Sequence, residues 1–274
     1  LALLGMVEGA LWALGVPEPG LYAGDLNTVW WLRPDLQTTQ RLVEEDLTFS
    51  ITTNDLGLRG MMPPEDEPWT LALGCSTTFG WGVSAEEAWP AQLAELTEQT
   101  IINGGMPGWS THQARLGAQR WLELEPDRVI LAYIVRDAQP AIRQDADSQP
   151  TPLLMRTHVA RLLQARLRPA GASAASSALP QVRVPPDAYH DNLVALIEQV
   201  GGAEVVLLAF PQQEPATAWR EVLASMPQPL LSPVLEPSSF FAQDPIHLNA
   251  AGHRALAEQL AADPAVRSTP PPRR

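Results

Sequence analysis

The chain has 274 residues, 45% of them hydrophobic, which is enough for one large domain with a buried core and a smaller extension. A formal net charge of −13 argues against nucleic acid and against anionic membrane surfaces as partners, because both attract basic proteins. One cysteine excludes an intrachain disulfide, and the five histidines lack the spacing of metal ligands, so neither a metal nor another cofactor is expected.

Residues 1–15 (LALLGMVEGALWALG) are apolar except for Glu8, but they are fewer than the ~20 residues that a membrane-spanning helix needs. We interpret them as the remnant of a membrane anchor or signal segment, which predicts an extracytoplasmic, membrane-anchored protein. The alternative is an amphipathic helix that packs on the domain of a cytoplasmic protein.

Residues 16–67 are predicted to form an N-terminal extension that is rich in Pro, Gly, Asp and Trp. Within it, residues 47–53 alternate in polarity as expected of a strand, and residues 54–57 (NDLG) indicate a turn. The proline- and acid-rich residues 61–68 then lead into the main domain.

The first strand of that domain is predicted at residues 69–73 (WTLAL), a short apolar run typical of a buried strand. Residues 84–87 (SAEE) form a capping-box pattern, and the helix that follows is expected to begin near Trp89. Ser76 therefore lies at the carboxyl end of a strand, on the edge where open α/β sheets bind ligands. The alternative for Ser76 is an ordinary residue of a strand-to-helix turn.

Strands and helices alternate along the rest of the domain, which is predicted to cover residues 68–265. This alternation indicates a three-layer α/β/α sandwich around a parallel five-stranded sheet of flavodoxin-like order, in addition to the small N-terminal extension. The remaining strands are expected at residues 100–102, 128–135, 203–210 and 228–231, and the helices at 110–124, 187–200, 215–226 and 250–262.

Residues 138–186 form a long insertion between two core strands, and such segments in compact domains are typically lids or binding loops. Apolar residues at helical spacing predict a helix at 153–168, and the Ala/Ser-rich residues 171–180 predict a mobile loop. The proline-rich residues 266–274 are predicted to form a disordered tail.

Asp244 and His247 precede the last helix, for which Asn249 is a suitable N-cap. A serine becomes a nucleophile when a base takes its proton, and the base needs an orienting partner. His247 can be the base for Ser76, and Asp244 can hold its imidazole from the same turn. The order Ser, Asp, His is shared with α/β-hydrolases, but their G-x-S-x-G pattern is absent because residue 78 is Thr.

These residues resemble the SGNH, or GDSL-like, hydrolases in four blocks. Residues 74–76 (GCS) resemble the Gly-Asp-Ser block, with Cys75 in place of Asp, and residues 244–247 match the Asp-x-x-His block. Residues 103–110 resemble the second block, whose glycine is Gly108. Residues 135–137 (VRD) lie where the third block has Gly-Asn-Asp, so that Arg136 replaces its oxyanion asparagine.

The resemblance implies an ester hydrolase, acting on a carbohydrate or small ester through an acyl-enzyme, with Ser76, His247 and Asp244 as catalytic triad. It also implies an oxyanion hole formed by the backbone N–H groups of Ser76 and Gly108 together with the Arg136 side chain. Two alternatives stay open: an O-acyltransferase that acts on a glycan, and a catalytically weak SGNH-like module for binding or assembly.

Several neighbouring residues are expected to have structural roles. His253 is predicted to be a solvated helix residue and His112 a surface residue, whereas Asp137 is predicted to be structural. Trp81 and Trp109 flank the site in sequence, and core packing is the expected role of both.

Overall fold

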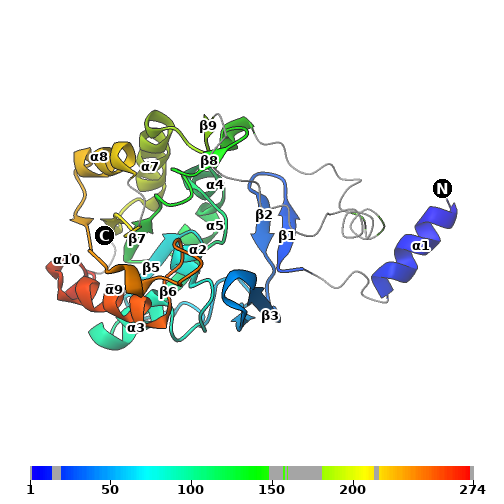
Figure 1. Cartoon of the computed structure of the whole chain (residues 1–274), viewed down its shortest axis with the longest axis horizontal. Helices are drawn as coiled ribbons and strands as arrows, with labels where there is room; N and C mark the ends of the chain where they lie inside the picture. Colours follow the sequence, from blue (N-terminus) through cyan, green and yellow to red (C-terminus); the bar gives the residue numbers. More distant parts are fainter. Residues whose placement is uncertain are drawn as a thin grey trace.

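The computed structural model describes residues 2–13, 20–147, 157, 159, 181–212 and 216–271. Its centre is a parallel sheet with helices on both faces (Figure 1). Except for residues 157 and 159, the predicted helix at 153–168 lies outside the described residues, as does the predicted loop at 171–180.

The strands of the sheet are β5 (Trp69–Gly74), β6 (Thr100–Gly105), β7 (Arg128–Ala132), β10 (Glu204–Leu208) and β11 (Leu230–Leu231). Their order is β11-β10-β7-β5-β6, and every neighbouring pair is parallel. Numbered along the chain, this is the 2-1-3-4-5 order of flavodoxin-like sheets, so the predicted fold class is confirmed. β7 and β10 end earlier than predicted, because the apolar runs continue as buried loop segments at the carboxyl edge.

Helices cover both faces of the sheet. On one face α3 (Trp89–Thr97) packs against α9 (Ala250–Ala262), and on the other α7 (Pro186–Val200) packs against α4 (Thr111–Gly117), α5 (Gln119–Leu122) and α8 (Thr217–Ser225) (Figure 1). The single helix predicted at residues 110–124 is divided into α4 and α5 at Ala118. The result is the expected three-layer arrangement.

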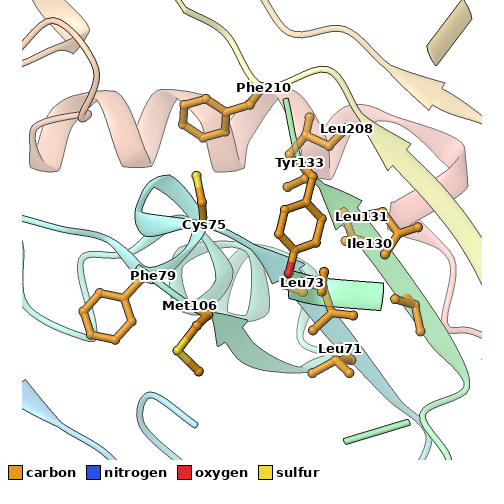
Figure 2. Packing of buried hydrophobic residues seen from close by; sticks show 14 of the residues in the cluster. Leu71, Leu73, Cys75, Phe79, Met106, Ile130, Leu131, Tyr133, Leu208 and Phe210 are labelled. Carbon is orange, nitrogen blue, oxygen red and sulfur yellow. The ribbon is translucent and has the colours of Figure 1, made fainter. Parts of the chain in front are cut away.

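The core surrounds the central strands along their length. Every residue of β5 and β7 is buried, because both faces of these strands meet helices. Figure 2 shows the apolar side chains of the two strands together with Tyr133 and Phe210 from the loops beyond β7 and β10. This packing holds the carboxyl ends of the strands in fixed positions.

The N-terminal extension contains more strands than predicted. They are β1 (Tyr22–Asp25), β2 (Val29–Leu32), β3 (Gln37–Leu42) and β4 (Leu47–Thr52), paired as two antiparallel hairpins, β1–β2 and β3–β4. Only β4 is predicted from the sequence. β3 (QTTQRL) is polar on both faces, and β1 and β2 have only four residues each, so none of them shows a clear strand period.

The helix α1 (Ala2–Ala13) lies apart from the sheet (Figure 1). Its apolar side chains Met6 and Val7 are 66% and 43% exposed and do not belong to the hydrophobic core. Within the described residues, no helix combines the length and the apolar composition required to cross a membrane.

The two ends of the insertion at residues 138–186 form a stem. β8 (Pro140–Ala141) pairs antiparallel with β9 (Gln181–Val182), and the 3-10 helix η2 (Asp145–Asp147) follows β8. Backbone hydrogen bonds continue the pairing from Arg183 N–H to Gln139 (2.9 Å) and from Val184 N–H to Asp137 (3.1 Å). The stem therefore starts at the carboxyl edge of β7.

The prediction of a disordered tail from residue 266 onward is wrong for its first residues. Residues 264–267 form α10 (Pro264–Arg267), in which Val266 is buried. Arg128, which is buried in β7, donates hydrogen bonds to the carbonyl groups of Val266 (3.2 Å) and Ser268 (2.9 Å). A buried guanidinium needs such acceptors, and this requirement orders the chain as far as Ser268.

Candidate active site

Ser76 is the first residue of the short helix α2 (Ser76–Phe79), directly after the carboxyl end of β5. α2 lies so close to β6 that a Cβ atom at Gly105 would come within 2.2 Å of the Phe79 backbone nitrogen. Asn103 of β6 holds α2 from the side by donating its amide hydrogens to the carbonyls of Thr78 (3.1 Å) and Phe79 (3.2 Å). The position of Ser76 is thus fixed by the neighbouring strand.

Arg59 of the N-terminal extension holds the end of the same helix. Its buried guanidinium donates to the carbonyl of Phe79, to that of Gly80 (2.7 Å) and to that of Val83 (2.6 Å). Burial lowers the pKa of Arg59 to about 10, so the side chain is still charged near neutral pH. The predicted turn at residues 54–57 is therefore followed by an arginine that supports the Ser76 turn.

His247, predicted as the base of a triad, lies within hydrogen-bond reach of both Ser76 and Asp244. His247 Nε2 is 2.8 Å from Ser76 Oγ, and His247 Nδ1 is 2.6 Å from Asp244 Oδ2. Ser76 is only 2% exposed and His247 7%, so both side chains are shielded from bulk water. The arrangement can move a proton from the serine to the imidazole.

The turn that carries Asp244 and His247 is held by the N-terminus of α9. Asn249 caps this helix by accepting the N–H of Gly252 (2.9 Å), and its amide donates to Phe240 (2.9 Å). Burial alone would raise the pKa of the Asp244 carboxyl. The hydrogen bond and charge of His247 outweigh that effect, assisted by backbone N–H groups, and the pKa is lowered. Asp244 therefore stays ionised and can hold the imidazole.

Gly108 lies in the turn between β6 and α4 and is partly exposed. Its φ of +86° is in the left-handed region that glycine adopts without steric cost. In the described part of the chain, the backbone N–H groups of Gly108 and Ser76 donate no hydrogen bond. Two unused donors at the carboxyl edge of neighbouring strands are suited to a developing negative charge.

Arg136 forms no ion pair with any described carboxylate. Its Nη1 donates to Gln139 Oε1 (2.7 Å), and its buried Nε has no partner among the described residues. The carboxylates of Asp137 and Asp145 are engaged elsewhere: Asp145 pairs with Arg183, and Asp137 accepts hydrogen bonds from Thr111. Burial lowers the pKa of Arg136, whereas Cys75 and Asp244 raise it, so the guanidinium lies within the electrostatic reach of the site.

Cys75 is fully buried beside Ser76. Its Sγ is 3.2 Å from Thr77 Oγ1, and Figure 2 shows the sulfur on the side of Phe210. Asp137 is also buried and is held by Thr111 (2.9 Å to the N–H), as expected of a structural residue. Its pKa is raised to about 6 by burial, against the lowering effect of the Thr111 hydrogen bonds.

His253 corrects the prediction of a solvated residue, since it is 1% exposed. Its Nδ1 accepts the backbone N–H of Trp89 (3.1 Å), and this contact joins α9 to the start of α3. Burial lowers the pKa of His253 to about 3, so that its ring is neutral at ordinary pH. The α9 sequence alone does not reveal this contact, because the partner is 164 residues away.

The remaining predicted residues follow the expected pattern in part. Trp109 is fully buried, and Trp81 packs edge to face on Phe49 with a centroid distance of 5.2 Å, which agrees with core packing. His112 is half-buried and, with Arg115 of α4, lines a cavity of about 310 Å³ whose other walls come from α7 and from the stem of the insertion. No group of three or more His, Cys, Asp or Glu side chains in the described ranges is placed to hold a metal ion.

Sequence analysis did not find two residues that contact the Gly108 turn. Trp30 Nε1 donates to the Pro107 carbonyl (3.1 Å), and Arg183 Nη1 donates to the Gly108 carbonyl (2.8 Å). Both lie far from Gly108 in sequence, in the N-terminal extension and the stem of the insertion. No local pattern marks either residue as part of the site.

The model of the GDSL-like lipase/acylhydrolase family matches residues 72–255. This range contains Ser76, Gly108, Arg136, Asp244 and His247, whereas Arg59 and Trp30 lie before it. No curated protein matches the sequence.

Among solved structures, the chain is similar to a protein of the G-D-S-L family of lipolytic proteins from Desulfitobacterium hafniense, with 15% identity, a TM-score of 0.47 and coverage of 70% of this chain and 96% of that one. It is also similar to an active-site mutant of a family two carbohydrate esterase from Clostridium thermocellum (11% identity, TM-score 0.47, coverage 74% and 65%). A third is the salicylyl-acyltransferase SsfX3 from a tetracycline biosynthetic pathway (14%, 0.42, 71% and 53%). All three TM-scores are below 0.5, so the family of this chain is assigned from the match to the family model alone.

Proposed function

The chain belongs to the GDSL-like lipase/acylhydrolase family, a family of ester-bond hydrolases, since the family model covers more than half of its length. From this premise we propose that it is a serine ester hydrolase that works through an acyl-enzyme, with Ser76 as nucleophile. The observation that carries the proposal is the hydrogen-bonded path from Ser76 Oγ through the His247 imidazole to the Asp244 carboxylate.

In the first half of the reaction, His247 Nε2 takes the Ser76 proton while Oγ forms a bond to the ester carbonyl carbon. The carbonyl electron pair moves to oxygen, and Asp244 stabilises the imidazolium that results. This step requires the tautomer in which Nδ1 carries the proton that faces Asp244. When the tetrahedral intermediate collapses, the ester C–O bond breaks, and the alcohol leaves with the proton from His247.

In the second half, water replaces the alcohol. His247 takes a proton from water, the hydroxide attacks the acyl carbon, and the acid leaves as Oγ regains its proton. Both tetrahedral intermediates carry a negative oxygen. The backbone N–H groups of Ser76 and Gly108, which have no other acceptor in the described part of the chain, are suited to bind it.

We propose Arg136 as a third oxyanion donor. Its position after β7, its unpartnered Nε and the absence of an ion pair with a described carboxylate support this role. A guanidinium donates hydrogen bonds and stays charged, so it can stabilise an oxyanion in place of a neutral amide.

The proposed substrate is an ester of a carbohydrate or another small molecule. The Trp30 ring, which lies against Gly108, meets Tyr22 edge to face at a centroid distance of 6.4 Å, and Tyr22 is 38% exposed. Such amphipathic aromatic surfaces suit a ligand with both apolar and polar faces, as sugar rings have. If a sugar hydroxyl attacked the acyl-enzyme in place of water, the same site would be an O-acyltransferase.

We also propose that residues 1–15 hold the protein at a membrane, outside the cytoplasm. The exposed apolar side chains of α1, which lie outside the core, support this location. The chemistry at Ser76 does not depend on it.

A fluorophosphonate probe tests the proposed function, because it labels serines that an adjacent base activates. We expect covalent labelling of the natural protein and none of a Ser76→Ala variant, and hydrolysis of a small acetyl ester should follow the same pattern. An unlabelled and inactive natural protein would instead support the binding or assembly module. Product analysis with an added sugar acceptor separates hydrolysis from acyl transfer.

A further inference from the structure

The Gly108 turn is held by side chains from two segments that lie outside the sheet. On its N-terminal side, Trp30 Nε1 donates to the carbonyl of Pro107 (3.1 Å). That carbonyl and the N–H of Gly108 belong to the same peptide group, and in a planar trans peptide they point in opposite directions. A donor that fixes the Pro107 carbonyl therefore also fixes the direction of the Gly108 N–H.

Trp30 is itself held firmly enough to act in this way. It pairs with Gly24 across the β1–β2 hairpin, and its carbonyl accepts hydrogen bonds from Trp109 Nε1 (3.2 Å) and Thr28 Oγ1 (3.0 Å). Its ring lies against Gly108, since a Cβ atom there would be 3.1 Å from Trp30 Cζ2. The hairpin and the turn thus exchange hydrogen bonds in both directions, and the indole has little freedom to rotate.

The C-terminal side of Gly108 is held by the stem of the insertion. Arg183 Nη1 donates to the Gly108 carbonyl (2.8 Å), which belongs to the next peptide group. The rest of the guanidinium forms a bidentate pair with Asp145, at 3.1 Å from Nε and 2.8 Å from Nη2. Asp145 also accepts the Ser110 hydroxyl (2.6 Å), so the stem contacts the turn at two points. Bidentate charged pairs of this kind fix orientation as well as distance.

We propose that Trp30 and Arg183 are positioning residues that aim the Gly108 N–H at the oxyanion. The inference rests on the proposed function, because it assigns these residues to the oxyanion hole of that reaction. The N-terminal hairpin is then part of the catalytic unit although it precedes the range of the family match. The stem of the insertion, which carries Arg183, is part of this catalytic unit as well.

A Trp30→Phe variant tests the first contact, because Phe keeps an aromatic ring but removes the indole N–H donor together with part of the bicyclic ring. Its matched control is Trp121→Phe, since Trp121 also donates its indole N–H to a backbone carbonyl, that of Leu56 (3.3 Å). The Trp121 ring packs against Trp31 and Trp109, but no hydrogen bond joins its indole to the Gly108 turn in the described part of the chain. We expect kcat on a small acetyl ester to fall at least tenfold in Trp30→Phe, with KM changed less than about twofold. Complete removal of an oxyanion donor costs about 10²–10³ in rate, and a misdirected donor costs less.

An Arg183→Met variant tests the second contact independently, with Arg220→Met as its control. Arg220 also donates to a backbone carbonyl, that of Phe210 (3.1 Å), but does not contact the turn. We expect a lower kcat and slower fluorophosphonate labelling in Arg183→Met, and neither change in the control.

Melting temperatures measured beside the kinetics separate positioning from a general loss of structure. The proposal requires that, well below both melting temperatures, Trp30→Phe loses kcat and Trp121→Phe keeps it, although Trp121 is the more deeply buried of the two (1% exposed). Equal kcat in both tryptophan variants, or an equal loss in both, would overturn it, and so would an Arg183→Met variant as active as its control. If the natural protein itself neither reacts with the probe nor hydrolyses esters, the proposed function fails instead.

Discussion

Cys75 and Ser76 are adjacent but have opposite surroundings. Cysteine is intrinsically the better nucleophile, so its place beside the proposed nucleophile raises a real alternative. Successive residues at the end of a strand point to opposite sides, and Cys75 is fully buried in the core while Ser76 Oγ meets His247. A buried thiol of this kind acts as a small hydrophobic side chain.

We therefore expect Cys75→Ala to keep most of the esterase activity and Ser76→Ala to lose nearly all of it. Initial rates on a small acetyl ester, measured well below the melting temperature of each variant, test this expectation. An inactive Cys75→Ala variant that is still folded, together with an active Ser76→Ala variant, would identify the cysteine as the nucleophile.

Arg136 is the second departure from the residues expected in this family. If its guanidinium contacts the oxyanion, Arg136→Ala should lower kcat at least tenfold, because one donor to the developing charge is lost. The melting temperature should change little, since the side chain makes one hydrogen bond within the described ranges, the one to Gln139. If Arg136→Ala leaves kcat unchanged while Arg136→Asn raises it, the guanidinium has no role at the oxyanion.

Single residues could be predicted where their partners are near in sequence or follow a fixed pattern. Asp244 and His247 are three residues apart in one turn, so their contact follows from spacing alone. Trp30, Arg183 and His253 contact partners that are 75 to 164 residues away, and no local pattern encodes those contacts.

At the level of elements, long apolar runs and caps could be predicted well. β5, α7 and α9 have close to their predicted limits, because their burial pattern and capping residues agree with each other. β4 could be predicted from its alternating pattern, but β1, β2 and β3 could not, since they are short or largely polar on both faces. Both hairpins are held by contacts with the main domain: Trp30 of β2 donates to Pro107, and Arg59 donates both to Ser50 of β4 (3.3 Å) and to Phe79 of α2.

Removal of the helix α1 is expected to have a smaller effect on fold and activity than removal of these hairpins. Because its apolar side chains are exposed and lie outside the core, a truncated protein that begins at Val16 should keep its fold and its activity. Melting temperature and kcat on a small ester, compared with those of the longer protein, test this. A truncated protein that unfolds would show that α1 packs on the domain, and the proposed membrane location would lose its main support.

In the whole molecule, the N-terminal extension and the stem of the insertion both contact the carboxyl edge of the parallel sheet. The sheet supplies Ser76 and the turn with Gly108, the extension supplies Arg59 and Trp30, and the insertion supplies Arg183. Removal of residues 16–67 should therefore impair the site even though the family match begins later. The contrast with removal of residues 1–15 distinguishes a structural extension from a segment that determines location.

The stability of the whole chain should depend on pH through two buried groups that act in opposite directions. His253 has a pKa of about 3 in the folded protein and 6.5 as its ordinary value, so below pH 6.5 the unfolded chain binds a proton that the folded chain does not. Its contribution to stability is complete above pH 6.5 and is lost as pH falls toward 3. Asp137, with its pKa raised to about 6, binds its proton more readily when folded and stabilises the protein as pH falls below 6.

A His253→Gln variant isolates the first of these two effects, because Asp137 contributes equally to both proteins. Urea unfolding at pH 7 and pH 5 gives the free energy of unfolding of each protein at both values. Between these two pH values the natural protein should lose about 2 kcal/mol more than the variant, the amount expected for one neutral histidine with a pKa near 3. Equal losses in the two proteins would mean that the His253 ring can take up a proton in the folded state, and α9 would then not be joined to α3 by a neutral imidazole.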